Sequence, residues 1–187
     1  MRILVICGST RAASTNSSLV RTAQAVAPAG IEIEIFKTLT ALPHFNPDDD
    51  HEPLPSAVAA LRADIAKSDA VLLSTPEYAG ALPGSFKNLL DWTVGGSELY
   101  RKPVAWLNAS SSPTGAANAH ASLQTVLGYL NVDLVTSACV RIPVPRSAVG
   151  SDGLIADPEV RGSLVAALET LARHALSAGA GVSLDRR

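Results

Sequence analysis

The start of the chain constrains the fold more than any other segment. Residues 3–7 read Ile-Leu-Val-Ile-Cys, an unbroken apolar run that stops at Gly8-Ser9. Such a run is typical of a strand buried on both faces, as in a parallel sheet with helices on either side. A second run, Ala70–Leu73, has the same character and stops before Pro76, which cannot donate to a sheet ladder. Two doubly buried strands predict a parallel sheet at the centre of the molecule.

Apolar residues at helical spacing alternate with short apolar runs along the rest of the chain. Strands are predicted at 31–36, 104–107 and 132–140, and helices around 19–26, 58–65, 86–92, 123–130 and 164–176. This alternation predicts an α/β fold, a doubly wound five-stranded parallel sheet with helices on both faces. Because 31–36 alternates apolar residues with Glu, it suits a sheet edge, which favours the flavodoxin-like strand order 2-1-3-4-5. In that order, ligands bind beyond the strand ends, beside strands one and three.

The alternation shows no repeat and no internal boundary, so one flavodoxin-like domain is expected over residues 1–176. The tail, residues 177–187, is rich in Gly and Ala and ends in Asp185-Arg186-Arg187. Chain ends of this composition are often poorly ordered, and the tail is expected to be mobile.

Composition narrows the range of partners. The 187 residues carry a formal net charge of -2, no Lys/Arg cluster and only 4% aromatic residues, which disfavours nucleic acid. No apolar run approaches the roughly 20 residues needed to cross a bilayer, so no membrane partner is expected. Because a strand is predicted to start at Arg2, no signal peptide is expected. Two cysteines without a spacing motif suit a reducing compartment, so a cytoplasmic location is expected.

The loop after the first strand carries the strongest functional signal. Residues 8–18 read Gly-Ser-Thr-Arg-Ala-Ala-Ser-Thr-Asn-Ser-Ser, between a central strand and a helix. Free N–H groups at the helix start, hydroxyl donors and Arg11 together suit a phosphate. The same residue types are preferred helix caps, so an ordinary capped helix start stays open. The loop lacks the Walker lysine and the G-x-G-x-x-G spacing, which disfavours a nucleoside triphosphatase and a Rossmann dinucleotide site.

Cys7 raises one alternative, because small phosphotyrosine phosphatases use a cysteine at this turn of a similar sheet. Their nucleophile needs an arginine six positions later to grip the phosphate. Here Arg11 follows Cys7 by four positions, and position 13 is Ala. Cys7 is therefore interpreted as a core residue of the strand.

Two further loops follow the third and fourth predicted strands. Residues 75–85 contain two prolines and two glycines, which fix a backbone path and expose peptide N–H and C=O groups. A flavin ring edge needs both kinds of group, although a turn that only starts a helix would look similar. Residues 108–118 are small and polar, which lets a flat ring lie close to the backbone. A flexible capping loop is the alternative there.

Together these loops resemble the NADPH-dependent FMN reductase family of flavodoxin-like proteins, which includes quinone, azo-dye and chromate reductases. The family pattern G-S-x-R-x-x-S-x-N is similar to Gly8–Asn16. The pattern P-E-Y-N-x-x-x-P-G-x-L-K-N-x-x-D-W is closely similar to Pro76–Trp92. Leu42–Asp48 also resembles the family's loop after strand two. The resemblance runs from about Ile3 to Leu130.

The resemblance implies a role for each matched position. The FMN phosphate would be bound by Ser9, Arg11, Ser14, Asn16 and Ser17. The isoalloxazine edge would be lined by Pro76, Glu77, Tyr78, Ala79 and Gly80, and the other side of the ring by Ser112 and Gly115. No catalytic side chain is implied, because the chemistry is centred on the flavin. The four histidines show no metal-ligand spacing.

Some positions depart from the family pattern. Ala79 stands where Asn is frequent, which removes a polar contact near the ring, and Gln124 stands where Arg is frequent. Ala116-Ala117 replace a common Gly-Gly pair, so a positive φ there would force the third loop onto another path. His120 is expected at a helix start, on the surface.

By resemblance, the protein is an enzyme that transfers hydride from NADPH or NADH to FMN. Electrons then pass to a small-molecule acceptor such as free flavin or a quinone. The alternative is an electron-carrier flavodoxin without a pyridine nucleotide site. The modest net charge and the absence of Trp and Tyr from the third loop disfavour it. A flavin-sensing or quinone-binding partner protein with weak turnover is a third possibility.

Family members are usually dimers or tetramers, so a homodimer or homotetramer is expected. Residues 86–100 carry more apolar groups than one buried face needs and are predicted to form the interface. The alternative is that Trp92 and Leu99 only cover their own core.

Overall fold

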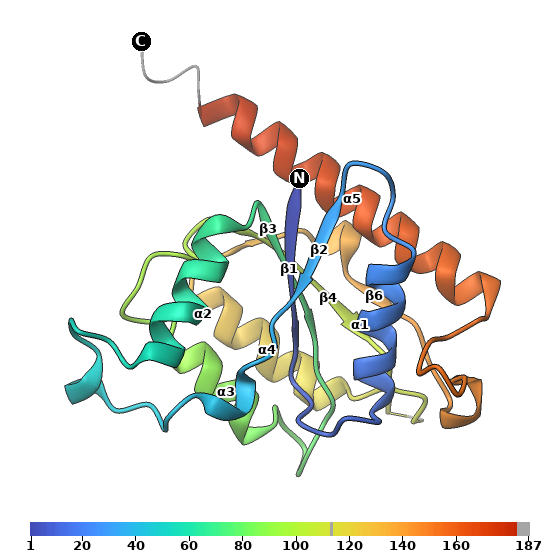
Figure 1. Ribbon diagram of the computed structural model, residues 1–187, viewed down its shortest axis with the longest axis horizontal. Coiled ribbons are helices and arrows are strands. Elements are labelled where there is room, and N and C mark those ends of the chain that lie inside the picture. Colours follow the sequence, from blue (N-terminus) through green and yellow to red (C-terminus); the bar gives the residue numbers. More distant parts are fainter. Residues whose placement is uncertain (113, 183–187) are drawn as a thin grey trace.

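Figure 1 shows the computed structural model, which describes residues 1–112 and 114–182. The strands of this part of the chain are β1 (Arg2–Cys7), β2 (Glu32–Ile35), β3 (Ala70–Ser74), β4 (Pro103–Asn108), β5 (Asp133–Leu134) and β6 (Val140–Arg141). The α-helices are α1 (Thr15–Ala25), α2 (Ser56–Lys67), α3 (Gly84–Asp91), α4 (Ala117–Tyr129) and α5 (Pro158–Val182). Strands and helices alternate as the apolar pattern predicted.

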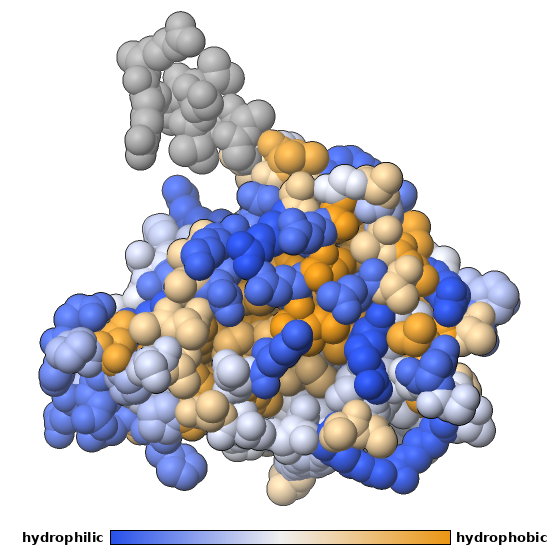
Figure 2. Space-filling view, in the orientation of Figure 1, coloured by the Kyte–Doolittle hydropathy of each residue, from blue (hydrophilic) through white to orange (hydrophobic). Residues whose placement is uncertain are grey.

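The sheet is parallel and has the order β2-β1-β3-β4-β5, which confirms the flavodoxin-like topology. Both strands predicted to be doubly buried lie in the middle of this order, and every residue of β3 is buried. The half-exposed strand β2 lies at the edge, where Glu32 faces solvent and Ile33 faces the core. Figure 2 shows the face of the molecule that is seen in Figure 1. Apolar side chains gather toward the middle of this face, with hydrophilic residues around them.

The predicted fifth strand, 132–140, is interrupted. β5 pairs with the start of β4, a 3₁₀ turn spans Thr136–Ala138, and β6 pairs with the end of β4. The turn buries Ala138 completely in the core. The chain then continues along the end of β4, where the Ile142 N–H donates to the Asn108 carbonyl at 2.8 Å. The prediction of one continuous strand was therefore wrong.

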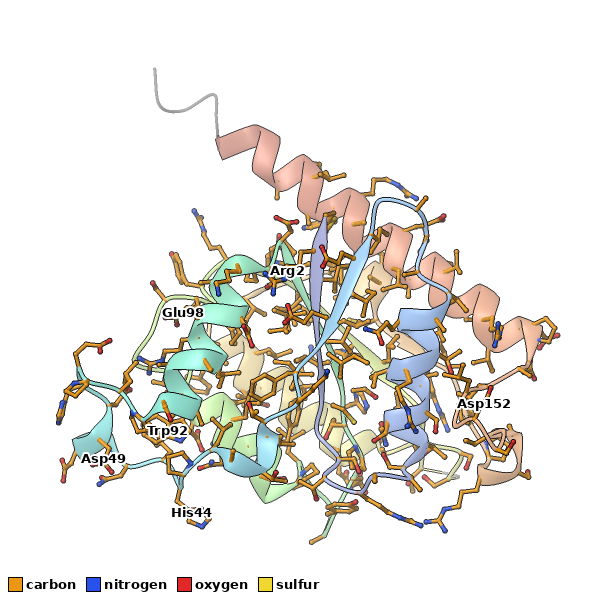
Figure 3. The ribbon with its side chains drawn as sticks, viewed as in Figure 1. Arg2, His44, Asp49, Trp92, Glu98 and Asp152 are labelled. Carbon is orange, nitrogen blue, oxygen red and sulfur yellow. The ribbon has the colours of Figure 1, made fainter. Side chains whose placement is uncertain are left out.

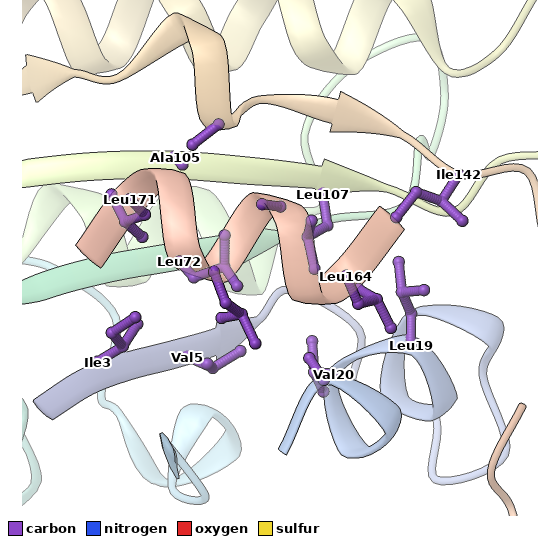
Figure 4. Packing of buried hydrophobic residues seen from close by; sticks show 14 of the residues in the cluster. Ile3, Val5, Leu19, Val20, Leu72, Ala105, Leu107, Ile142, Leu164 and Leu171 are labelled. Carbon is purple, nitrogen blue, oxygen red and sulfur yellow. The ribbon is translucent and has the colours of Figure 1, made fainter. Parts of the chain in front are cut away.

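Two separate hydrophobic clusters hold the helices to the two faces of the sheet. Successive residues of β1 point to opposite faces, so Ile3 and Val5 join one cluster while Leu4 and Ile6 join the other. The first cluster, shown in Figure 4, packs α1 and α5 against the sheet. The second packs α2, α3 and α4. Each helix thus buries one apolar stripe, as expected for a doubly wound sheet.

Several apolar residues of the predicted dimer interface are buried within the chain, whereas Val94 and Tyr100 are exposed. Phe86 and Trp92 are fully buried, and Leu99 is 4% exposed. The Trp92 indole packs edge-on against Phe45 and donates to the Pro43 carbonyl at 2.8 Å. In Figure 3, Trp92 lies at the base of the loop that carries His44 and Asp49. Phe86, Trp92 and Leu99 cover their own core, which was the alternative for Trp92 and Leu99, and an interface within residues 86–100 stays a prediction.

The last helix is longer than the sequence pattern indicated. α5 continues past Leu176 to Val182, in a segment whose alanines are strong helix formers. Residues 183–187 of the predicted tail lie outside the described residues, and the domain boundary at 176 stays a prediction. Over residues 1–112 and 114–182, no helix combines the length and apolar character needed to cross a membrane.

Candidate cofactor site

Three loops meet at the carboxyl edge of the sheet, toward the lower edge of Figure 1. They follow β1, β3 and β4, which are neighbours in the sheet, so residues far apart in sequence come together. Between them lies a cavity of about 480 Å³. Its walls are residues 15–16, 75–77, 109–112, 114, 116, 144 and 146. This volume is within the range of ligand sites for small molecules and cofactors.

The first loop is a capped helix start. Ser14 accepts a hydrogen bond from the Ser17 N–H at 2.9 Å, and the two hydroxyl oxygens lie 2.7 Å apart. The Ser17 hydroxyl also donates to the Arg11 carbonyl at 3.3 Å. This capping does not exclude phosphate binding, because the first N–H groups of a helix have no intrahelical acceptor. Those groups belong to Thr15 and Asn16, which line the cavity.

Gly8 lets the first loop approach the second loop closely. A Cβ at this position would lie 2.8 Å from Cγ of Phe86 and 2.9 Å from the Thr75 hydroxyl oxygen. The Gly8 N–H donates to the Ser74 carbonyl at 2.7 Å. The Ser74 hydroxyl in turn donates to the buried Asn16 amide oxygen at 2.9 Å. These contacts fix the start of α1 beside the end of β3.

The second loop contains a two-residue turn that follows the cavity-lining residues 75–77. Tyr78 and Ala81 exchange backbone hydrogen bonds of 3.1 and 3.0 Å across it. Both central residues have positive φ, 50° at Ala79 and 73° at Gly80. Asn tolerates this conformation better than Ala, since its side chain can bond locally. The departure from the family pattern at Ala79 therefore leaves strain in the turn.

Glu77 joins the second loop to the third. Its carboxylate accepts the Ala119 N–H, in the first turn of α4, at 3.0 Å. The residue at the N-cap of α4 is Ala116, which has no side-chain acceptor to offer. A carboxylate at a helix N-terminus is also favoured by the helix dipole. Glu77 thus acts as the cap of a helix that lies 40 residues away in sequence, counted from 77 to 117.

The third loop is held by side chains on both sides. The Asn108 amide donates to the Gly115 carbonyl at 2.6 Å, and its oxygen accepts the Ser110 N–H at 2.9 Å. Arg141 donates to the Ser112 carbonyl at 3.2 Å and lies directly over Gly115, where a Cβ would collide with the guanidinium. Ala116 has a φ of 55°. The positive φ considered in the sequence therefore occurs at Ala116, and the contacts of Asn108 and Arg141 stabilise the backbone at the neighbouring Gly115.

His120 is buried rather than on the surface, which corrects the sequence prediction. It lies in the first turn of α4, is 9% exposed, and packs its ring 4.4 Å from that of Trp106. Neither ring nitrogen has a hydrogen-bond partner among the described residues. Burial lowers the pKa of the imidazole, and the nearby Glu77 carboxylate offsets only part of this effect. The ring is therefore neutral at pH 7.

The geometry of Cys7 does not favour a phosphatase nucleophile. Burial raises the pKa of the Cys7 thiol more than its contacts with Ser9 and Ser17 lower it. A cysteine nucleophile needs the thiolate, so this environment favours the inert form. Within the described part of the chain, no group of His, Cys, Asp and Glu residues is arranged to hold a metal ion.

The structure brings only some of the predicted site residues to the cavity. Those that line it are Asn16, Pro76, Glu77 and Ser112. Ser9 and Ser17 line a neighbouring cavity of about 370 Å³ on the β2 side of the first loop. Arg11, Ser14, Tyr78, Ala79, Gly80 and Gly115 lie in the same loops but line neither cavity.

The roles assigned from the motifs did not include Thr15, Ser110, Thr114 and Arg146, which line the cavity. The first three lie within the loops already singled out. Arg146 carried no local signal, because only the pairing of β6 with β4 brings it to the site.

The residues present fit FMN. The start of α1 and the hydroxyl-rich third loop offer donors to a phosphate, and the fixed backbone of residues 75–77 offers peptide groups to a ring edge. Fold and cavity together define a flavodoxin-like protein suited to a phosphorylated cofactor. Residues 1–143 match the NADPH-dependent FMN reductase family, and the chain belongs to that family.

Individual relatives agree with this assignment. The NAD(P)H-dependent FMN reductase of Pseudomonas aeruginosa is 32% identical over 173 residues, which are 91% of this chain and 93% of the relative. A 2-hydroxy-1,4-benzoquinone reductase from a Burkholderia species is 31% identical over 164 residues, 86% of this chain and 88% of the relative. The solved structure of FerB, a flavoenzyme NAD(P)H:(acceptor) oxidoreductase from Paracoccus denitrificans, has a TM-score of 0.75 at 29% identity. It covers 92% of this chain and 98% of its own.

These findings confirm the family identified from the sequence. They also confirm the expected class, an FMN-dependent NAD(P)H oxidoreductase. Nothing in them supports the alternative of an electron carrier.

Proposed function

We propose that this protein transfers hydride from NADPH or NADH to FMN and passes the electrons to a small acceptor, a quinone or free flavin. The observation that carries the proposal is the cavity bounded by the start of α1 and by the loops after β3 and β4. The names of the relatives support a quinone or flavin as acceptor.

The proposed cofactor contacts divide between the loops. The phosphate lies at the start of α1, among Ser9, Arg11, Ser14, Asn16 and Ser17. The ring edge lies against Pro76, Glu77, Tyr78, Ala79 and Gly80, and Ser112 and Gly115 lie on the opposite side. The contacts of Gly8, Glu77 and Asn108 support this division, because they set the spacing between the loops.

When bound, FMN supplies the redox chemistry that no side chain here provides. The protein's part is to bind FMN, to orient it and to shield it from solvent. Asn16 and Thr15 present the helix start, the fixed backbone of 75–77 presents peptide groups, and the Glu77–α4 contact keeps the second and third loops together. No side-chain acid or base is required, which agrees with the buried, neutral His120.

Anaerobic mixing of the protein with FMN and NADPH tests the proposal. Rapid loss of the oxidised flavin absorbance is expected, and a mixture without protein is the control. Loss only after a partner reductase is added would support an electron carrier instead. Repeating the mixture with NADH, and adding quinone or free flavin after reduction, identifies the preferred donor and acceptor.

We also propose a homodimer or homotetramer located in the cytoplasm. Because Trp92 is buried within the chain, the candidate interface is the exposed part of residues 86–100, which lines a groove together with the second half of α4. Tyr100 is 58% exposed there and Tyr129 is 85% exposed, and Val94 lies beside them. Light scattering tests the assembly, since a mass near the chain's 19.3 kDa would contradict it.

A further inference from the structure

We propose that Arg146 is a phosphate-binding side chain of the cofactor cavity. The inference rests on the proposed function and adds a residue to it. Arg146 lies outside every motif of the resemblance, which ends near Leu130. It lines the cavity because the folded chain brings it next to residues that are far away in sequence.

The backbone that carries Arg146 is fixed against the third loop. After β6, the Val144 N–H donates to the Ala109 carbonyl at 3.0 Å, and the Val144 side chain is 2% exposed. Prolines at 143 and 145 flank this anchor and restrict the backbone further. A 3₁₀ turn, Arg146–Ala148, follows at once. Arg146 is therefore held at the edge of the cavity by a segment with little freedom.

Among the described residues, no charged group is paired with Arg146. It is the only Lys or Arg among the described residues that line the cavity. Glu77, the only carboxylate in the same set, is engaged by the N–H of Ala119. No ion pair or side-chain hydrogen bond of Arg146 occurs among the described residues. By contrast, Arg141 is engaged by the Ser112 carbonyl.

The residues that line the cavity around Arg146 favour binding of an anion. Thr15 and Asn16, in the first turn of α1, line the same cavity, and that turn carries no acidic residue. A helix start and an arginine with no side-chain partner among the described residues line one cavity. This combination favours a phosphate group, which arginine can bind through two parallel hydrogen bonds. The sequence motif assigns this charge to Arg11. Both arginines are exposed, but only Arg146 lines the cavity.

Flavin titrations of variants test the inference. Arg146→Ala, Arg146→Lys and Arg11→Ala are titrated with FMN and with riboflavin, which lacks the phosphate, and flavin fluorescence is followed. We expect Arg146→Ala to weaken FMN binding at least about tenfold, the effect of losing one charge-assisted contact, without changing riboflavin binding. Arg146→Lys should retain part of the affinity. Arg173→Ala, on the exposed face of α5, is the control for loss of one positive charge. It should change neither the FMN affinity nor the riboflavin affinity.

The arms of the experiment separate the two sources of phosphate. If Arg146→Ala leaves FMN binding intact but weakens NADPH binding, the phosphate belongs to the pyridine nucleotide. An equal loss of FMN and riboflavin affinity, or no change with FMN and NADPH, would overturn the inference. If the wild-type protein binds FMN, and Arg146→Ala binds FMN and NADPH with the same affinities as the wild type, only the inference about Arg146 fails. A wild-type protein that binds neither FMN nor NADPH would contradict the proposed function as well.

Discussion

The first and third loops line the same cavity but are held in different ways. The first loop is organised mostly by its own residues, as in the Ser14–Ser17 cap and the Arg11 N–H donating to the Ser9 hydroxyl at 3.3 Å. The third loop depends on Asn108 at its base, Arg141 from β6 and Glu77 from the second loop. Contacts between residues close in sequence can be inferred from a sequence motif. Contacts between residues far apart in sequence form only when the sheet brings them together. The two loops should therefore respond differently to mutation.

The largest effect is expected where the first loop has a distant constraint, at Gly8. Gly8→Ala places a Cβ against Phe86 and Thr75, so the free energy of unfolding should fall by about 1–3 kcal/mol, with weaker FMN binding. Urea denaturation measures the change. Gly84→Ala is the matched control, because its Cβ would meet nothing within 4 Å, and its stability should be unchanged or slightly higher. Equal losses in both variants would show that the close approach at Gly8 has no role.

Glu77 tests the distant support of the third loop. Glu77→Ala removes the acceptor for the Ala119 N–H and should lower the free energy of unfolding by about 0.5–2 kcal/mol, as for other lost helix caps. Glu77→Gln keeps an acceptor oxygen and should lose less. Glu169→Ala, exposed on α5, should stay within about 0.5 kcal/mol of the wild type. If Glu77→Ala proves as stable as this control, the capping role is refuted.

His120 makes the start of α4 sensitive to pH. Because burial lowers its pKa in the folded state, the unfolded chain binds the proton more readily, starting near the ordinary value of about 6.5. This contribution to stability is present above that pH and is lost as pH falls through it. His120→Phe keeps the packing on Trp106 without a titrating group. In thermal melts, the stability of His120→Phe relative to the wild type should rise as the pH is lowered from 7 to 5.5. A difference between the two proteins that stays constant over this range would contradict the assignment.

The smallest effect is expected at the strained turn of the second loop. Ala79→Gly removes the penalty of a left-handed alanine and should raise the free energy of unfolding by up to about 1 kcal/mol. The same substitution at Ala59, an exposed position within α2, should lower it by about 0.5–1 kcal/mol. A loss at both positions would show that the turn relaxes without strain.

The sequence predicted those parts of the molecule in which local pattern decides the structure. The buried runs at Ile3 and Val71 placed β1 and β3 in the middle of the sheet, and the serines of the first loop marked a helix start. The break between β5 and β6 was missed because burial of Ala138 is a packing outcome. The burial of Trp92 stayed open because its partners, Phe45 and Pro43, come from a loop without periodicity.

The same limit applies to the site. Asn16, Pro76, Glu77 and Ser112 were named from motifs and do line the cavity. The capping role of Glu77, the burial of His120 and the approach of Arg146 each depend on elements far apart in sequence. No spacing rule could have predicted them.

A crystal structure of the protein with FMN tests the central claim most directly. The account predicts the phosphate at the start of α1, beside Thr15 and Asn16, with the ring against residues 76–80 and the third loop. FMN bound in the groove between α3 and α4, or anywhere outside the cavity after β1, β3 and β4, would contradict it.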